Sequence, residues 1–251
     1  MLTIKIMKRF FVSFAAAVVA MAFAASANAQ ISVGAGFGHM TRTGKAVSGN
    51  VSEKSEPMGL SGFYVNGNYT FSLLSKNWGE LALQPGLTYQ FGADVEREEE
   101  AGIKGKGTFS EHYLDIPVNV RYSYDIKPGT IKLHAYAGPV LSFGLASIEK
   151  AKVESEEGWF ISKTNLYTGK YSIKSSDDSL NETGKSDEYS GYSFFDLKLG
   201  IGLGATIMDK YEVKVGYNFG LLNRTAGKNV DSGNKFISHT HVLQIGVGYN
   251  F

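Results

Sequence analysis

Apolar and polar residues alternate along most of the chain, and residues 237–251 show this most clearly. From His239 onward every second residue is aromatic or aliphatic, or is a histidine, whereas most of the residues between them are polar or small. Successive side chains of a β-strand point to opposite faces, so this segment predicts a strand with one apolar and one polar wall. The apolar wall consists of His239, His241, Leu243, Ile245, Val247, Tyr249 and Phe251.

Seven earlier segments show the same two-residue period, which gives eight predicted strands in all. Each holds about 10 to 16 residues, longer than the roughly 5 to 6 that are usual in globular proteins and long enough to cross a bilayer at a tilt. An even number of strands allows an antiparallel sheet to close on itself. The pattern therefore predicts an all-β fold, an eight-stranded antiparallel up-and-down transmembrane β-barrel. The seven earlier segments are 31–40, 62–73, 78–91, 111–124, 131–146, 192–207 and 211–221.

The connections between these strands alternate between long and short. Long polar loops are predicted at about 41–58, 92–108, 147–190 and 223–235, and tight turns follow the even-numbered strands. Outer-membrane barrels place long loops outside the cell and short turns in the periplasm, whereas a soluble eight-stranded barrel has no reason to sort its connections. We therefore expect both termini to be periplasmic.

Aromatic residues give a separate indication of a membrane. In the predicted topology they form two belts separated by aliphatic residues, as expected where amphipathic rings lie at both bilayer interfaces. The predicted periplasmic belt is Trp78, Tyr122, Tyr124, Tyr211, Tyr249 and Phe251, and the outer belt is Phe37, Phe63, Phe91, Phe143, Phe195 and Phe219.

The N-terminus has the pattern of an export signal. Lys5, Lys8 and Arg9 precede an apolar stretch at 10–25, and Ala27-Asn28-Ala29 is a small-x-small cleavage site. We expect cleavage after Ala29, so that residues 1–29 are a signal peptide and residues 30–251 form the barrel domain. No cysteine follows the apolar stretch, so a lipoprotein is not expected.

Composition narrows the function classes. The formal net charge is +1, and it becomes −2 once the three basic residues of the signal are removed. Since no basic block is present, nucleic acid is not expected as a partner. The chain has no cysteine, which excludes disulfides and thiolate metal sites.

Several segments resemble the outer-membrane protein β-barrel domain family of Gram-negative envelopes, in particular its PorT-like group. They are Tyr113-Leu114-Asp115-Ile116-Pro117-Val118, Tyr136-Ala137-Gly138-Pro139, the glycine-rich segment 200–205 and the closing segment 246–251. The resemblance implies a location in the cell outer membrane, surrounded by lipid and lipopolysaccharide. The ending at Phe251, with Tyr249 before it, resembles the signal that the barrel assembly machinery reads. The PorT name also implies an alternative role as an accessory barrel of a secretion system.

Candidate catalytic and metal-binding patterns are weak. Glycines at 34, 36 and 38, and at 200, 202 and 204, recur at every second residue, which is the spacing of a barrel wall and not of a nucleotide-binding loop. His239 and His241 have a spacing that could bind a metal, but no third ligand accompanies them. Ser110, Glu111 and His112 are neighbours, whose side chains alternate between faces in a strand. We expect no catalytic, cofactor or metal residues, with a lipid-modifying enzyme kept as an alternative.

The predicted inward faces carry equal numbers of acidic and basic residues. Unpaired charge is costly in a narrow interior, so the balance predicts an ion-pair network in a lumen filled by side chains, with Tyr64, Tyr113, Tyr136 and Phe194 supplying bulk. A structural or surface-interaction role follows, and a small passive pore is the alternative. The acids are Glu80, Asp115, Asp196 and Glu212, and the bases are Arg121, Lys132, Lys198 and Lys214.

Two further expectations concern irregular positions. The predicted loop 147–190 carries aromatic residues among charges, Trp159 and Tyr167 among them, and parts of it alternate. We hypothesise that its flanking strands extend above the membrane as a hairpin that binds an extracellular ligand. Pro85, Pro117 and Pro139 fall inside predicted strands, where each removes a hydrogen-bond donor, so we expect β-bulges there.

Overall fold

The computed structural model describes residues 29–48, 51–100, 102–186, 191–225 and 234–251. The predicted signal peptide lies outside these ranges, except that Ala29 begins the first strand. Within the same ranges no helix has the length and apolar character needed to cross a membrane.

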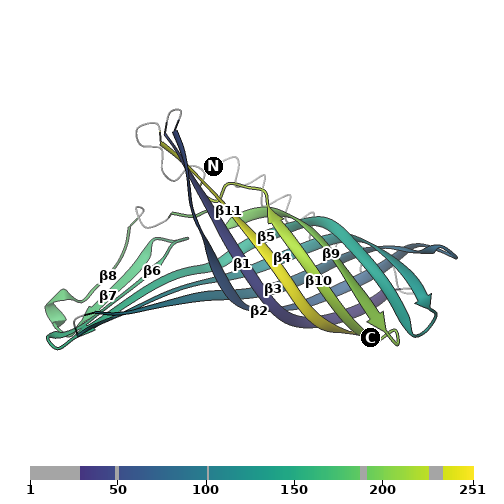
Figure 1. The fold of residues 1–251 in the computed structure, drawn as a ribbon, viewed down its shortest axis with the longest axis horizontal. Coiled ribbons are helices and arrows are strands. Elements are labelled where there is room, and N and C mark those ends of the chain that lie inside the picture. Colours follow the sequence, from purple (N-terminus) through teal and green to yellow (C-terminus); the bar gives the residue numbers. More distant parts are fainter. Residues whose placement is uncertain (1–28, 49–50, 101, 187–190, 226–233) are drawn as a thin grey trace.

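Eight strands form a closed antiparallel ring, so the predicted fold class is confirmed (Figure 1). Each strand pairs with the next along the chain, and the pairing of β1 with β11 closes the ring. In ring order the strands are β1 (Ala29–Ser48), β2 (Val51–Lys76), β3 (Gly79–Glu100), β4 (Ile103–Lys127), β5 (Ile131–Ser155), β9 (Phe195–Ile207), β10 (Tyr211–Gly220) and β11 (Asn234–Asn250).

The wall has an apolar outer face and a polar inner face. Val33, Leu203 and Val247 are exposed on the outside, whereas Gln90 and Asp115 are buried inside the ring. This reverses the arrangement of a soluble barrel. It places apolar side chains against apolar surroundings and leaves the polar side chains to satisfy one another in the lumen.

At one end the strands continue beyond the predicted boundaries, and we call this the extended end. The segments 41–58 and 92–108 were predicted as loops, but their described residues extend the hairpins β1–β2 and β3–β4. The predicted strand boundaries were wrong because a segment was assigned to a strand only where it had an apolar face. A polar hairpin in water still pairs its backbone N–H and C=O groups, and needs no apolar face to do so.

The wall divides at the extended end (Figure 1). Pairing of β2 with β3 stops at Ser61 and Ala93, although both strands continue. Beyond this point β11, β1 and β2 form a three-stranded extension. The strands β3, β4 and β5 form a six-stranded extension with β6 (Gly158–Asn165), β7 (Lys170–Ser175) and β8 (Glu182–Lys185).

The described part of the predicted loop, residues 147–186, is therefore mostly strand and not one long loop. These residues hold the end of β5, the strands β6 to β8 and a short 3-10 helix, η1 (Asp178–Leu180). Residues 148–155 of β5 pair with β6 as an antiparallel hairpin, so of the two flanking strands only β5 extends, and its partner there is β6 and not β9, which begins at Phe195.

The expectation of bulges at the three prolines was wrong. Pairing is interrupted next to Pro85 and Pro117, but the register is the same on both sides of each gap. Pro139 keeps its pairing with Leu199, without a register shift. The register shifts lie elsewhere, for example between Arg42 and Gly44. Each proline therefore lacks the N–H of a backbone hydrogen bond between the strands, but it does not introduce the extra residue that defines a β-bulge.

The opposite end, which we call the short-turn end, carries tight turns. At one of them Met208 and Asp209 both have positive φ, 54° and 57°, as a type I′ hairpin turn requires. Aromatic rings gather near this end, where Trp78 stacks on Tyr122 at a centroid distance of 6.1 Å. A second group of rings lies toward the extended end and includes the Phe63–Phe91 pair at 5.5 Å.

Candidate functional site

The lumen is filled with side chains at the middle of the barrel. The cavity there measures about 40 Å³ and is lined by Tyr64, Tyr136 and Asp115 among other polar residues. A water needs about 10 to 15 Å³ of such volume, so the cavity holds only a few waters.

Tyrosines fill the space that wall glycines leave open. A Cβ at Gly246 would overlap the hydroxyl of Tyr64, and a Cβ at Gly202 would overlap the ring of Tyr136. Tyr113 is also buried, as predicted. Phe194 was predicted to point inward but is 52% exposed. It precedes β9, which begins at Phe195, so the strand alternation does not apply to it.

Arg121, Glu212 and His134 form a buried group toward the short-turn end. An Arg121 Nη atom lies 3.4 Å from a Glu212 carboxylate oxygen. His134 Nδ1 accepts a hydrogen bond from Arg121 at 3.0 Å, and His134 Nε2 lies 3.0 Å from a Glu212 carboxylate oxygen. Sequence reasoning did not select His134, although it shares the inward face of β5 with Lys132 and Tyr136.

Asp115 and Lys198 form a second buried pair, with 3.6 Å between Oδ2 and Nζ. The Lys198 ammonium also lies 4.6 Å from the centroid of the Tyr113 ring. Asp115 and Arg121 were expected in one network, but the structure gives them different partners. Asp196 accepts a hydrogen bond from the backbone N–H of Leu222 at 3.3 Å, and so holds the segment that follows β10.

The other predicted lumen residues lie nearer solvent or in looser contacts. Lys132 lies 3.9 Å from both Asp125 and Asp209 at the short-turn end. Glu80 lines a cavity of about 50 Å³ together with Arg121. Lys214 lines the central cavity beside Glu212.

A small apolar cluster of residues from β1, β2, β4 and β11 faces the lumen. Met40, Leu60, Tyr113 and Val242 pack together, each at most 1% exposed. Val242 belongs to the inward face of β11, which otherwise carries polar or small residues. Tyr113 joins this cluster to the charges on both sides of it, since its ring lies 4.6 Å from the Lys198 ammonium and its hydroxyl donates to Glu111.

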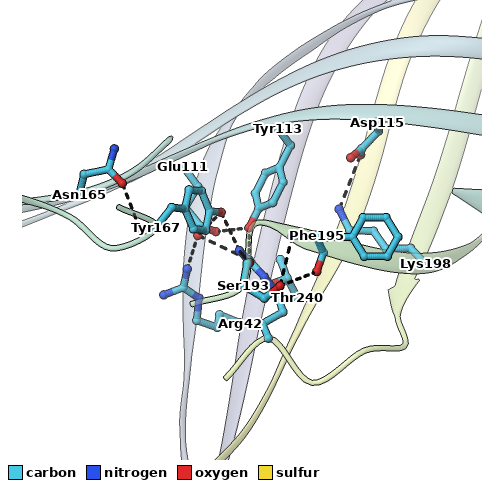
Figure 2. Close-up of polar contacts among 11 residues, drawn as sticks. Arg42, Glu111, Tyr113, Asp115, Asn165, Tyr167, Ser193, Phe195, Lys198 and Thr240 are labelled. Carbon is cyan, nitrogen blue, oxygen red and sulfur yellow. Dashed lines mark hydrogen bonds and ion pairs between the residues drawn. The ribbon is translucent and has the colours of Figure 1, made fainter. Parts of the chain in front are cut away.

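The mouth at the extended end holds a cluster that sequence reasoning missed (Figure 2). Glu111 of β4 is fully buried and contacts two arginines, Arg42 of β1 and Arg224 after β10. The Arg224–Glu111 distance is 3.6 Å, and Arg42 Nη2 donates to the same carboxylate oxygen. Tyr113 adds a hydrogen bond to the other oxygen at 2.7 Å.

Tyr167 closes this cluster from the turn between β6 and β7. Its hydroxyl accepts a hydrogen bond from Arg224 at 2.6 Å and donates to Glu111 at 3.4 Å. Its ring occupies the space above Gly144, where a Cβ would overlap it. Burial, and next the Glu111 carboxylate, raise the pKa of Tyr167 to about 12, so the phenol is neutral at physiological pH.

Two aromatic rings hold Arg42. Its guanidinium carbon lies 4.6 Å from the centroid of Phe109 and 4.2 Å from that of Tyr192. Such contacts favour a cation and fix the plane of the guanidinium.

The alternation of inward and outward residues gave a weak signal for two of the three residues that were missed. Arg42 continues the inward alternation of Gly38 and Met40 by one step, and Glu111 shares the inward face of Tyr113 and Asp115. Because the first strand was predicted to end at residue 40, Arg42 was assigned to a loop and not to the inward face. Arg224 lies outside any strand, so alternation carried no signal for it.

The candidate catalytic residues point to different sides of the wall, whereas the two histidines of the metal pattern lie side by side. His112 lies against Phe91 at a centroid distance of 4.9 Å and contacts Tyr89, whereas Glu111 points into the mouth. His239 and His241 have ring centroids 6.4 Å apart. Tyr249 and Phe251 lie close together at the short-turn end, with their ring centroids 5.0 Å apart.

Solved structures similar to this chain are outer-membrane barrels. The attachment invasion locus protein Ail of Yersinia pestis, in complex with the heparin analogue sucrose octasulfate, is 13% identical, with 89% of this chain and 99% of that chain covered and a TM-score of 0.36. Neisserial surface protein A is 12% identical, with 89% and 97% covered and a TM-score of 0.34. OprG of Pseudomonas aeruginosa is 10% identical, with 89% and 96% covered and a TM-score of 0.37.

No curated protein matches the chain. The model of one family, described as the outer membrane protein beta-barrel domain, matches residues 10–251. The apolar outer wall, the polar filled lumen and this match agree, and the chain belongs to the outer membrane protein beta-barrel domain family as an integral protein of the outer membrane.

Proposed function

We propose that the protein is a closed surface-binding barrel, which holds its six-stranded extension outside the cell as a platform for an extracellular ligand. One observation carries the proposal: the wall continues past the filled mouth as paired strands. The strand β6 of this extension carries Trp159 and Phe160 at its start, 40% and 39% exposed. Exposed aromatic residues are enriched where proteins bind partners.

The filled lumen argues against the alternative of a passive pore. Ions would have to pass the cluster at Glu111 and the middle of the lumen, where the cavity measures only about 40 Å³. Planar-bilayer recording should therefore give no discrete conductance steps, and regular steps would make the pore the better reading.

We also propose that the protein is not an enzyme. The carboxylate best placed for chemistry, Glu111, is held between two arginines, and its neighbour His112 faces the other side of the wall. Mass spectrometry of lipid A from a deletion strain should show unchanged acyl chains.

The orientation is part of the proposal. We place both termini in the periplasm, with Tyr249 and Phe251 as the signal for the barrel assembly machinery and lipopolysaccharide around the outer rim. The chain has no cysteine, so single cysteines can report sidedness. Glu157→Cys, at the turn between β5 and β6, should react with an impermeant maleimide on intact cells, and Lys210→Cys, at the turn between β9 and β10, should react only after lysis. The opposite result would invert the topology.

The binding role is tested by a matched pair of variants. The purified barrel in lipid vesicles is applied to arrays of glycans and matrix proteins. Trp159→Ser combined with Phe160→Ser should abolish the wild-type signal, whereas Trp78→Ser, at a tryptophan 50% exposed near the short-turn end, should retain it. No wild-type signal, or equal loss in both variants, would contradict a binding role for the six-stranded extension.

A further inference from the structure

A pocket opens where the wall divides, between the three-stranded extension and the segments around Tyr192 and Thr225. We call it the fork pocket. Its volume is about 480 Å³, within the range of roughly 300 to 1,000 Å³ that is usual for small-molecule sites. Arg42 lies in its lining, with Tyr192 and Phe236 as aromatic walls and the hydroxyls of Ser55 and Ser238 nearby.

Arg42 is a buried cation with an unused donor. Its side chain is 7% exposed, and Phe109 and Tyr192 hold its plane. One Nη atom donates to Glu111, but Nε has no hydrogen-bond partner. A buried donor without a partner costs free energy, and because Nε is closed to solvent, a ligand acceptor in the fork pocket recovers that cost only if the Arg42 side chain turns toward it.

Charge around the pocket indicates the sign of that ligand. Among the residues that the structure describes, three cations line the fork pocket, Arg42, Lys45 and Lys54, together with two acids, Glu53 and Glu56. Arg42 and Tyr192 also line a second pocket, of about 250 Å³. The second pocket is lined by more acids than cations. The acids are Asp94, Glu96 and Glu149, and the cations are Arg42 and Lys150. An anion is therefore favoured in the fork pocket and disfavoured in its neighbour.

The cluster at the mouth strengthens the preference. Glu111 compensates two arginines, so these three side chains carry a net positive charge. A second anion near Arg42 would balance it, because a buried unpaired cation is unfavourable.

We propose that the fork pocket binds a small ligand bearing one carboxylate, sulfate or phosphate group on a body the size of a sugar ring. The oxyanion accepts hydrogen bonds from Arg42, and the ring of the ligand packs against Tyr192 and Phe236. The assignment rests on the proposed surface-binding role, since it names a ligand class for the extended end of the same barrel.

The test is calorimetric titration of the full-length mature barrel in nanodiscs. The probes are glucuronate, glucose 6-sulfate, glucose 6-phosphate and neutral glucose. At least one anionic sugar should bind, neutral glucose should not, and comparison of the three identifies the oxyanion. Binding of glucose as strong as that of the anionic sugars, or no binding of any of them, overturns the proposal.

Two variants at the same ion pair separate a binding role from a structural one. Arg42→Gln should weaken binding by about ten-fold or more, as expected for the loss of a hydrogen bond to a charged group. Glu111→Gln breaks the same pair but removes the competing carboxylate, so binding should become tighter. If both variants shift affinity in the same direction, the effect is structural and the proposal fails.

Controls keep the result interpretable. Lys104→Gln removes one positive charge from an exposed pair with Glu99 on the six-stranded extension, and should leave the affinity unchanged. If Arg42→Gln does not fold, Arg42→Lys replaces it, since lysine keeps the charge and lacks Nε. Unchanged affinity in Arg42→Lys would overturn the role of Nε.

Anion binding without any array signal would contradict the six-stranded platform alone, and an array signal without anion binding would contradict the fork pocket alone.

Discussion

Arg121 of β4 and Glu212 of β10 form an ion pair across the lumen at 3.4 Å, although β5 and β9 lie between their strands in the wall. Both side chains are only 4% exposed, and His134 of the intervening β5 contacts both. The pair therefore connects parts of the ring that share no backbone hydrogen bonds.

Arg121→Ala should lower the free energy of unfolding by roughly 3–5 kcal/mol, because Glu212 is left buried with less compensation. The heat-modifiable shift of the folded barrel in gels, with urea titration, measures the change. The exposed pair Lys104–Glu99 is the control, and Lys104→Ala should cost less than about 1 kcal/mol. An unfolding midpoint equal to wild type in Arg121→Ala would refute an internal ion-pair network.

Gly216→Ala should destabilise the barrel by about 1–3 kcal/mol through overpacking. The added Cβ would overlap only the hydroxyl oxygen of Tyr136, whereas the ring carbon beside it would be at an acceptable 3.4 Å. Tyr136→Phe should therefore rescue Gly216→Ala, and a double-mutant cycle by urea unfolding gives the coupling energy. Additive effects of the two changes would show that Tyr136 does not fill the space opposite Gly216.

High pH should loosen the mouth through Tyr167. Its pKa rises from 10.0 in the unfolded chain to about 12 in the folded protein. The folded state therefore holds the proton more tightly between these values, and the free energy of unfolding falls as the pH rises through this window. Tyr167→Phe has no such proton, so its stability relative to wild type should improve from pH 10 to pH 12. A constant difference between the two proteins across this window would contradict the burial of the phenol beside Glu111.

Cleavage of the precursor should follow Ala29. Cleavage at this site removes Ala29 and keeps β1 from Gln30 onward, where Gln30 pairs with Thr70 of β2. Edman sequencing of the protein purified from outer membranes should begin at Gln30. A mature chain that retains Met1, or that begins at a residue other than Gln30, would be inconsistent with the predicted signal.

Local patterns were enough for the strands of the wall. The inward positions of Asp115, Arg121 and Glu212 followed from their place in an alternating run, because consecutive side chains of a strand point to opposite faces whatever the strand packs against. Phe194 shows the limit of this rule, since its segment joins β9 one residue later.

By itself, the sequence determined that eight strands alternate between an apolar and a polar face, which is a property of neighbouring residues. Only the tertiary structure decided which charges meet, because contacts across a lumen depend on the stagger and tilt of the closed ring. Arg42, Glu111 and Arg224 come from two strands and a connection far apart in the chain, and they converge only once the ring has closed. The division of the wall above Ser61 and Ala93 is likewise a matter of which backbones pair, and no side-chain period records it.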